Sequence, residues 1–142
     1  MNILTADPGK MTGWAMYITE TDDFSSGQLP WFEHLEWFEK VYRSFDVVIS
    51  ESFVITAATL KKSRQSWSLE AIGAMRYMLE KQGRNLVLQS PGEAKGFATP
   101  EKLKKVGWWL PGNDHAQDAA RHMLTYVVRN SHEIGFDLHR LM

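Results

Sequence analysis

Four side chains of this sequence could together hold divalent cations: Asp7, Glu51, His115 and Asp118. Asp7 and Glu51 each end a short apolar run, whereas His115 and Asp118 are three residues apart within a helical pattern, so both would point from one helix face. Three carboxylates and one imidazole would carry a net charge of roughly −3, which is unfavourable unless cations neutralise it. Oxygen-rich ligands favour Mg²⁺ or Mn²⁺, and the imidazole shifts the preference toward Mn²⁺.

Each of these four residues also has a purely structural interpretation. Asp7 precedes Pro8-Gly9 and could simply start a turn. Glu51 could face solvent at the end of a strand. His115 and Asp118 could lie in the first turn of a helix, where a carboxylate complements the helix dipole. The combination is much less expected by chance than any one member, and it is the combination that indicates a metal site.

The elements that would position these residues alternate between strand and helix patterns. Residues 2–7 and 12–19 are typical of two strands joined by a turn, and 25–29 of a third, weaker strand. Apolar residues then follow a helical period in 31–45, a β-branched run follows in 46–51, and further patterns predict a helix over 59–82, a strand over 84–89, short helices within 91–112 and a last helix from 113–114 to about 130. The order βββαβαβα predicts an α/β fold with a mixed five-stranded sheet flanked by helices, in one domain spanning 1–142.

If the strands 2–7 and 46–51 are parallel neighbours, Asp7 and Glu51 emerge at the same edge of the sheet, where open α/β sheets bind ligands. Two further residues of the last helix are interpreted differently. Asp114 is expected to be an N-cap rather than a ligand. His122 is expected to be a packed or surface histidine rather than a third ligand.

Composition excludes several classes of protein. The 142 residues, 44% of them hydrophobic and including six Trp and seven Phe, suit one domain with a sizeable core. The sequence contains no apolar run long enough for a transmembrane helix and begins without the pattern of a secretory signal, so a cytoplasmic protein is expected. The absence of Cys excludes disulfides, thiolate metal sites and cysteine nucleophiles.

Charge is unevenly distributed although the net charge is only −1. Residues 1–51 carry a net −6, residues 52–110 a net +6 and residues 111–142 a net −1. The middle of the chain could therefore contact phosphates. The candidate phosphate contacts are Lys61, Lys62, Arg64, Lys95, Lys102, Lys104 and Lys105. The alternative is an ordinary solvated helix face.

The predicted helix over 59–82 is apolar over a wide arc, which usually means more than one partner surface. We therefore expect it to form the interface of a homodimer. The alternative is a core helix that is buried entirely within one chain.

Four segments resemble the RuvC-type Holliday junction resolvases of the RNase H-like superfamily. They are Asp7-Pro-Gly-Lys-Met-Thr-Gly-Trp-Ala, Ile49-Ser-Glu-Ser-Phe53, Ser90-Pro91 followed by Lys95, and His115-Ala-Gln-Asp-Ala-Ala120. Their order and approximate spacing match across about residues 3–128. The resemblance implies an RNase H-like fold, a symmetric dimer and symmetric nicking of four-way DNA junctions. It gives the metal-ligand roles to Asp7, Glu51, His115 and Asp118.

The sequence also departs from that family. Gly13-Trp14 follows Gly9 in a shifted register, and the chain is shorter than bacterial members and closer in length to phage-encoded ones, for which the location would be the host cytoplasm. The aromatic residue that stacks at the junction centre lies three residues past the catalytic Glu in the family. Val54 occupies that place here, with Phe53 just before it.

We therefore expect hydrolysis of phosphodiesters with two Mg²⁺ or Mn²⁺ ions, with Asp7 bridging both, Glu51 on one and His115 and Asp118 on the other. The products would be 5′-phosphate and 3′-hydroxyl ends.

Three alternatives are distinguishable. Another RNase H-like nuclease acting on flaps, branched DNA or structured RNA would share the metal site. An actin-like ATPase or sugar kinase shares the pattern Asp-Pro-Gly-x-x-Thr-Gly but needs a second domain. A DNA-binding module without catalysis would bind DNA and not cut it.

Overall fold

A computed structural model gives the fold, and it describes residues 1–53 and 66–142. Its sheet consists of β1 (Asn2–Asp7), β2 (Met11–Ile18), β3 (Asp23–Pro30), β4 (Val47–Glu51) and β5 (Val87–Gln89). The strand order is β3-β2-β1-β4-β5. β1 is antiparallel to β2 and β2 to β3, whereas β4 is parallel to both β1 and β5. The parallel pairing of β1 with β4 confirms the arrangement on which the prediction about Asp7 and Glu51 depended.

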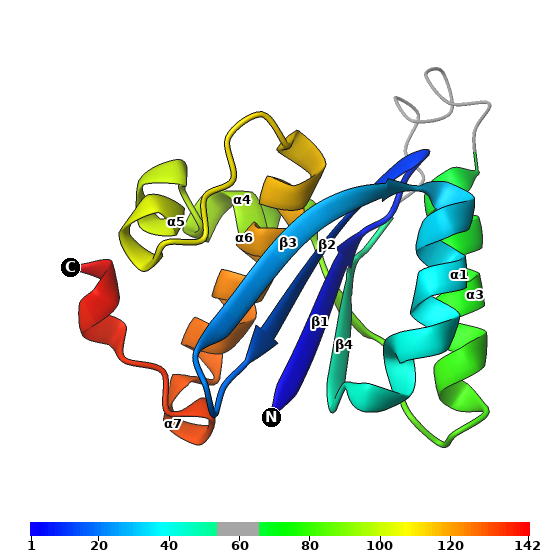
Figure 1. Ribbon diagram of the computed structural model, residues 1–142, viewed down its shortest axis with the longest axis horizontal. Coiled ribbons are helices and arrows are strands. Elements are labelled where there is room, and N and C mark those ends of the chain that lie inside the picture. Colours follow the sequence, from blue (N-terminus) through cyan, green and yellow to red (C-terminus); the bar gives the residue numbers. More distant parts are fainter. Residues whose placement is uncertain (54–65) are drawn as a thin grey trace.

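Helices cover both faces of this sheet (Figure 1). They are α1 (Trp31–Val41), α3 (Trp67–Glu80), α4 (Pro91–Phe97), α5 (Pro100–Val106), α6 (Asp114–Arg129) and α7 (Ser131–Ile134), with 3₁₀ turns at Tyr42–Ser44 and Leu138–Leu141. α1 and α3 lie together on one face, and α6 lies on the other with α4 and α5 beside it. The predicted α/β class, with a mixed five-stranded sheet flanked by helices, is confirmed. Within the described residues, no helix is both long and apolar enough to span a membrane.

Some predicted boundaries differ from the observed ones. The strand predicted over 84–89 begins only at Val87, because the Arg84 amide still donates to the carbonyl of Leu79 at the end of α3 and pairing with β4 starts at Val87. Helix α1 ends at Val41 and continues as a 3₁₀ turn to Ser44 rather than as an α-helix to residue 45. The helix predicted over 59–82 is described from Trp67 onward, and residues 59–65 lie outside the described part of the chain.

The start of α6 also corrects one prediction. Asp114 is the first residue of the helix, and the N-cap position belongs to Asn113. The Asn113 side chain donates to the carbonyl of Pro111 and makes no capping bond to the helix.

Alternation along the strands divides the core in two. In β1, Leu4 and Ala6 pack with α1 and α3, whereas Ile3 packs with the α6 side and the Thr5 hydroxyl donates to the carbonyl of Ala119 at 2.7 Å. Odd-numbered residues of β1 thus face α6, and Asp7 continues that series.

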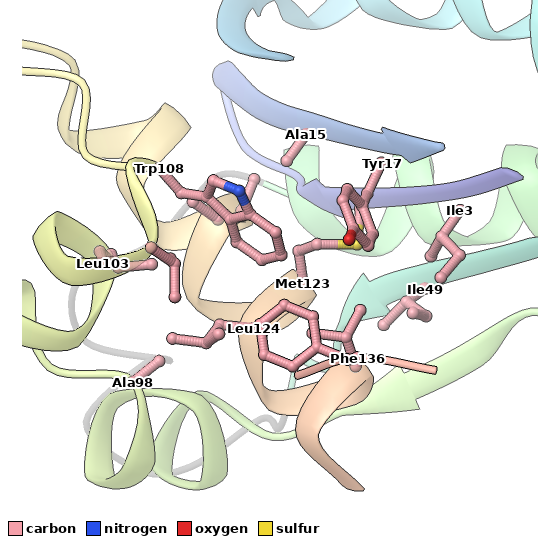
Figure 2. Packing of buried hydrophobic residues seen from close by; sticks show 14 residues of the cluster. Ile3, Ala15, Tyr17, Ile49, Ala98, Leu103, Trp108, Met123, Leu124 and Phe136 are labelled. Carbon is pink, nitrogen blue, oxygen red and sulfur yellow. The ribbon is translucent and has the colours of Figure 1, made fainter. Parts of the chain in front are cut away.

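The core on the α6 side gathers residues that are far apart in the sequence. Figure 2 shows Ile3 and Ile49 from the sheet near Met123, Leu124 and Phe136, with the aromatic rings of Tyr17 and Trp108 beside them. Burial of this apolar area, at about 25 cal/mol per Å², is the main force that holds α6 against the strands.

Helix α6 approaches the sheet most closely at Gly13 in β2. A Cβ atom at this position would lie 1.8 Å from the carbonyl oxygen of His115, a distance that no side chain permits. The glycine therefore allows the first turn of α6, which carries His115 and Asp118, to rest directly on β2.

Candidate metal centre

Asp7 and Glu51 lie side by side because their strands are parallel and in register. The pairing of β1 with β4 matches Ala6 with Ser50, so the next residue of each strand is a carboxylate at the same edge of the sheet. Both side chains are largely shielded from solvent, with exposed fractions of 15% for Asp7 and 19% for Glu51. Two carboxylates in such a site repel each other unless a proton or a cation lies between them.

The Asp7 carboxyl shows the effect of that repulsion. Burial, together with the charge of Glu51, a shared hydrogen bond with Glu51 and the charge of Asp118, raises its pKa from the ordinary value of 3.8 to about 9. Lys95 acts in the opposite direction. Without a cation, therefore, Asp7 holds a proton at neutral pH.

The pKa of Glu51 shifts in the opposite direction from that of Asp7, its neighbour. Burial by itself would raise the pKa of the Glu51 carboxyl, but hydrogen bonds from His122 and Asp7, with the charges of His122 and Lys95, together outweigh burial and hold the pKa below its ordinary value. Glu51 is thus ionised while Asp7 is not. The contrast follows from their partners rather than from depth of burial.

Helix α6 brings the other two predicted residues toward Asp7. The Nδ1 atom of His115 lies 3.8 Å from Oδ2 of Asp7, and Asp118 is near enough for its charge to raise the pKa of Asp7. Asp118 also lies 4.0 Å from the Nε atom of Arg121, one turn further along the helix. The structure therefore gathers all four predicted residues at one edge of the sheet.

Their arrangement in this structure is not yet that of a closed metal site. Within residues 1–53 and 66–142, no three His, Asp or Glu side chains converge tightly enough to form one. The donor set nonetheless fits a hard divalent cation, since it is rich in carboxylate oxygen with one imidazole. The raised pKa of Asp7 indicates the same need, because the causes that raise it also favour a positive charge beside the carboxylates.

An open cleft of about 640 Å³ adjoins these residues. Asp7 and His115 line one side of it, and Pro8, Gly9, Lys10, Met11 and Pro30 line the rest. The turn that forms this wall is held by hydrogen bonds between Gly9 and the Thr12 hydroxyl, and the Ser68 hydroxyl of α3 donates to the carbonyl of Pro8 at 2.7 Å. The volume falls in the range of ligand-binding clefts.

The predicted phosphate contacts have different surroundings. Lys95 in α4 is close enough to act on the pKa of both Asp7 and Glu51. Three lysines of α5 contact nearby groups of the chain: Lys102 donates to the carbonyl of Phe97, Lys104 lies over the Trp109 ring and Lys105 reaches the carbonyl of Leu141. Lys61, Lys62 and Arg64 lie outside the described residues.

Phe53 immediately precedes Val54, which occupies the position expected for a residue that stacks at the junction centre. Phe53 is partly buried and packs against the core formed with α1 and α3. Val54 lies outside the described residues.

Sequence reasoning missed the partners of Glu51. Gln89 ends β5, and it is matched with Glu51 in the parallel pairing of β4 with β5. His122 lies one turn beyond Asp118, is 1% exposed and contacts both Glu51 and Gln89. The sequence does contain a signal for Gln89. Like Asp7 and Glu51, it is a polar residue at the end of a predicted strand, in this case the strand over 84–89.

No protein-family model matches the chain, and no curated protein matches it either. Two solved structures are similar in fold. T. thermophilus RuvC in complex with Holliday junction substrate is 18% identical, with a TM-score of 0.61, over 92% of this chain and 96% of that chain. A second Thermus thermophilus RuvC structure is also 18% identical, with a TM-score of 0.60, over 92% of this chain and 97% of that one. The RuvC-like, RNase H-like fold that the sequence predicted is thereby confirmed.

Proposed function

We propose that this chain, as one RNase H-like domain over residues 1–142, is a divalent-metal-dependent endonuclease that resolves four-way DNA junctions by paired symmetric nicks. The observation that carries the proposal is the meeting of Asp7, Glu51, His115 and Asp118 beside an open cleft, at the edge of a RuvC-like sheet. The structural relative in complex with a Holliday junction substrate favours branched DNA as the substrate. A phage-type origin and a cytoplasmic location stay predictions.

The metal would be Mg²⁺ or Mn²⁺, held by the four residues. When bound, two such ions supply Lewis-acid activation of water and neutralise the charge that develops on the phosphate. Asp7 lies near Glu51 as well as near His115 and Asp118, so its carboxylate would be the ligand that the two ions share. Binding requires that Asp7 release its proton, so affinity should rise with pH.

The chain's own residues would orient the DNA backbone. Lys95 lies near the carboxylates, and a phosphate placed beside them would pair with its ammonium group. The cleft wall from Pro8 to Met11 offers space for the strand next to the scissile phosphate. Lys102, Lys104 and Lys105 on α5 remain the proposed contacts to more distant phosphates. Lys61, Lys62 and Arg64 also remain proposed phosphate contacts.

A homodimer would supply the two active sites that paired nicks require. Helix α3 buries Ala71, Ile72, Met75 and Leu79 against its own chain, so it is in part the core helix of the alternative interpretation. The neighbouring outer surface of α1 and α3 nonetheless exposes large apolar side chains, with Phe32 63% and Tyr77 65% exposed. We propose this surface as the dimer interface.

The dimer can be tested by light scattering after gel filtration. We expect a dimer for the wild type and a monomer for Phe32→Glu combined with Tyr77→Glu, because buried charge is costly at an interface. A monomeric wild type, or a dimeric double variant, would contradict the assignment of this surface.

The nuclease proposal is tested with a labelled four-way junction, a matched duplex, a flap and an RNA–DNA hybrid, each with Mg²⁺, Mn²⁺ or chelator. Paired nicks in the junction, lost with chelator, are expected. Asp7→Asn should abolish cutting and spare junction binding, because it removes a ligand without changing shape. Asp23→Asn, at an exposed carboxylate at the start of β3, is the matched control and should cut normally.

The other outcomes separate the alternatives. Cutting of the flap or the hybrid, with the junction spared, would replace the substrate and leave the metal site in place. Junction binding without any metal-dependent cutting would favour a DNA-binding module. Wild-type activity in Asp7→Asn would refute the site itself.

A further inference from the structure

A buried histidine links Glu51 to a residue that has no place in the proposed metal set. The Nε2 atom of His122 lies 3.0 Å from Oε2 of Glu51, and its Nδ1 atom lies 2.9 Å from Oε1 of Gln89. His122 is 1% exposed and Gln89 4% exposed. Both ring nitrogens of His122 are therefore engaged inside the protein, where they cannot also bind a cation.

The Glu51 carboxylate determines which ring nitrogen of His122 carries a hydrogen. A carboxylate that binds a cation only accepts hydrogen bonds, so Nε2 of His122 carries the hydrogen of its contact with Glu51 in the metal-bound state. Gln89 can satisfy Nδ1 in either amide orientation, as acceptor or as donor, because the two ends of the amide are interchangeable by a flip. In both cases the His122 Nε2–H donates to Oε2 of Glu51.

Gln89 is held in place independently of His122. It ends β5 opposite Glu51, and its carbonyl accepts a hydrogen bond from the Ser52 amide at 2.8 Å. The chain of contacts thus runs from the strand backbone through the amide and the imidazole to the carboxylate. The imidazole and the amide are buried and the contact with Glu51 is partly buried, so these bonds are stronger than they would be in water.

We propose that His122 is a positioning residue for the metal centre, which with Gln89 fixes the Glu51 carboxylate by occupying its Oε2 and leaving Oε1 for a cation. The inference rests on the proposed function, since it concerns a ligand of that site. Groups that hold a ligating carboxylate commonly change metal affinity or activity by about 10- to 100-fold when removed. His122 is not itself a ligand in this scheme.

The test measures Mn²⁺ binding directly, by the electron paramagnetic resonance signal of free Mn²⁺, on the full chain without DNA. His122→Leu should weaken the binding that depends on Asp7 by roughly 10- to 100-fold. His122→Gln should restore most of it, because its side-chain amide can donate to Glu51 from nearly the same position. Junction binding without divalent cation should be unchanged in both variants.

His34→Leu is the matched control, because His34 is also fully buried but lies in α1, on the other face of the sheet. It should leave Mn²⁺ affinity unchanged, which separates loss of positioning from general loss of stability. If His122→Leu does not fold, Gln89→Leu tests the proposal instead. It keeps the imidazole but removes its hydrogen bond with Gln89, and it should also weaken Mn²⁺ binding.

Two results would overturn the proposal, and a third would separate it from the proposed function. Wild-type Mn²⁺ affinity in folded His122→Leu, or in Gln89→Leu if the former does not fold, would overturn the role of His122 alone. Failure of the wild type to bind Mn²⁺ through Asp7 would overturn the metal centre and this inference together. Normal Mn²⁺ behaviour of all variants as expected here, with no cutting of the junction, would support the positioning role and refute the proposed function.

Discussion

The metal-free protein should lose stability as pH rises from 6.5 to 8.5, and Asp7→Asn should remove that loss. The cause is the pKa of Asp7, which is about 9 in the folded protein against an ordinary value of 3.8. Between those two values the folded state keeps a proton that the unfolded state has released. Rising pH therefore favours unfolding throughout that interval.

The magnitude follows from linkage. One proton held only by the folded state changes the free energy of unfolding by about 1.4 kcal/mol per pH unit. Two units amount to about 3 kcal/mol, which for a domain of this size lowers Tm by on the order of 10 °C.

The pH interval is chosen so that other perturbed groups stay constant. His34 is fully buried and burial lowers its pKa from 6.5 to about 4, so its contribution changes mainly below pH 6.5 and by only about 0.4 kcal/mol above it. Glu51 is ionised throughout, since its pKa lies below the ordinary value of 4.5. The pKa of Tyr17 is raised to about 12 by burial and by its hydrogen bond with Asp22, which places its titration above the interval.

The assay is urea unfolding followed by tryptophan fluorescence, in chelator, at pH 6.5, 7.5 and 8.5. The free energy of unfolding of the wild type and of the control Asp23→Asn should fall with pH, whereas that of Asp7→Asn should stay nearly level. Saturating Mn²⁺ should abolish or reverse the wild-type fall, because the ion stabilises the ionised carboxylate. Parallel pH profiles for the wild type and Asp7→Asn would refute this account of the carboxylate pair.

Three further perturbations test other parts of the structure. Gly13→Ala should lower the free energy of unfolding in urea by about 1–3 kcal/mol, because the alanine Cβ would meet the His115 carbonyl. A variant as stable as the wild type would show that α6 does not rest on β2. As pH falls from 6.5 to 4, the wild type should lose up to about 3 kcal/mol of stability through His34, because burial resists protonation of a ring whose nitrogens have no partner among the described residues. His34→Leu should remove that loss. An unchanged difference in stability between the two proteins across that range would contradict the prediction. Lys95→Met should reduce the salt dependence of junction binding by about one unit of slope; an unchanged slope would remove Lys95 from the phosphate contacts.

The residues that could be predicted from the sequence are those governed by short-range periodicity. Asp7 and Glu51 each end an apolar run, and parallel strands in register must bring such residues to one edge. His115 and Asp118 share a helix face because of their spacing. In each case a rule about one element, or one pair of elements, was sufficient.

The rest depends on how distant elements meet. The contact of His122 with Glu51 requires that His122 of α6 lie beside the last residues of β4 and β5. No local pattern in the sequence specifies that position. The Arg84 guanidinium likewise bonds to carbonyl groups of residues about forty positions earlier, a contact that no local pattern predicts. Gly13 is part of a sequence motif. Only the structure shows why a glycine is needed there, since a side chain would meet the carbonyl of His115.

The distribution of the site over the chain has a consequence for synthesis. Asp7 and Glu51 leave the ribosome more than sixty residues before His115 and Asp118, and α6 is a late element that packs against strands formed by the first part of the chain. A nascent chain therefore carries two of the four carboxylate and imidazole groups without the other two. If these four residues form the proposed metal site, that site is complete only once α6 has docked against the strands, so metal binding would then report that this helix is in place.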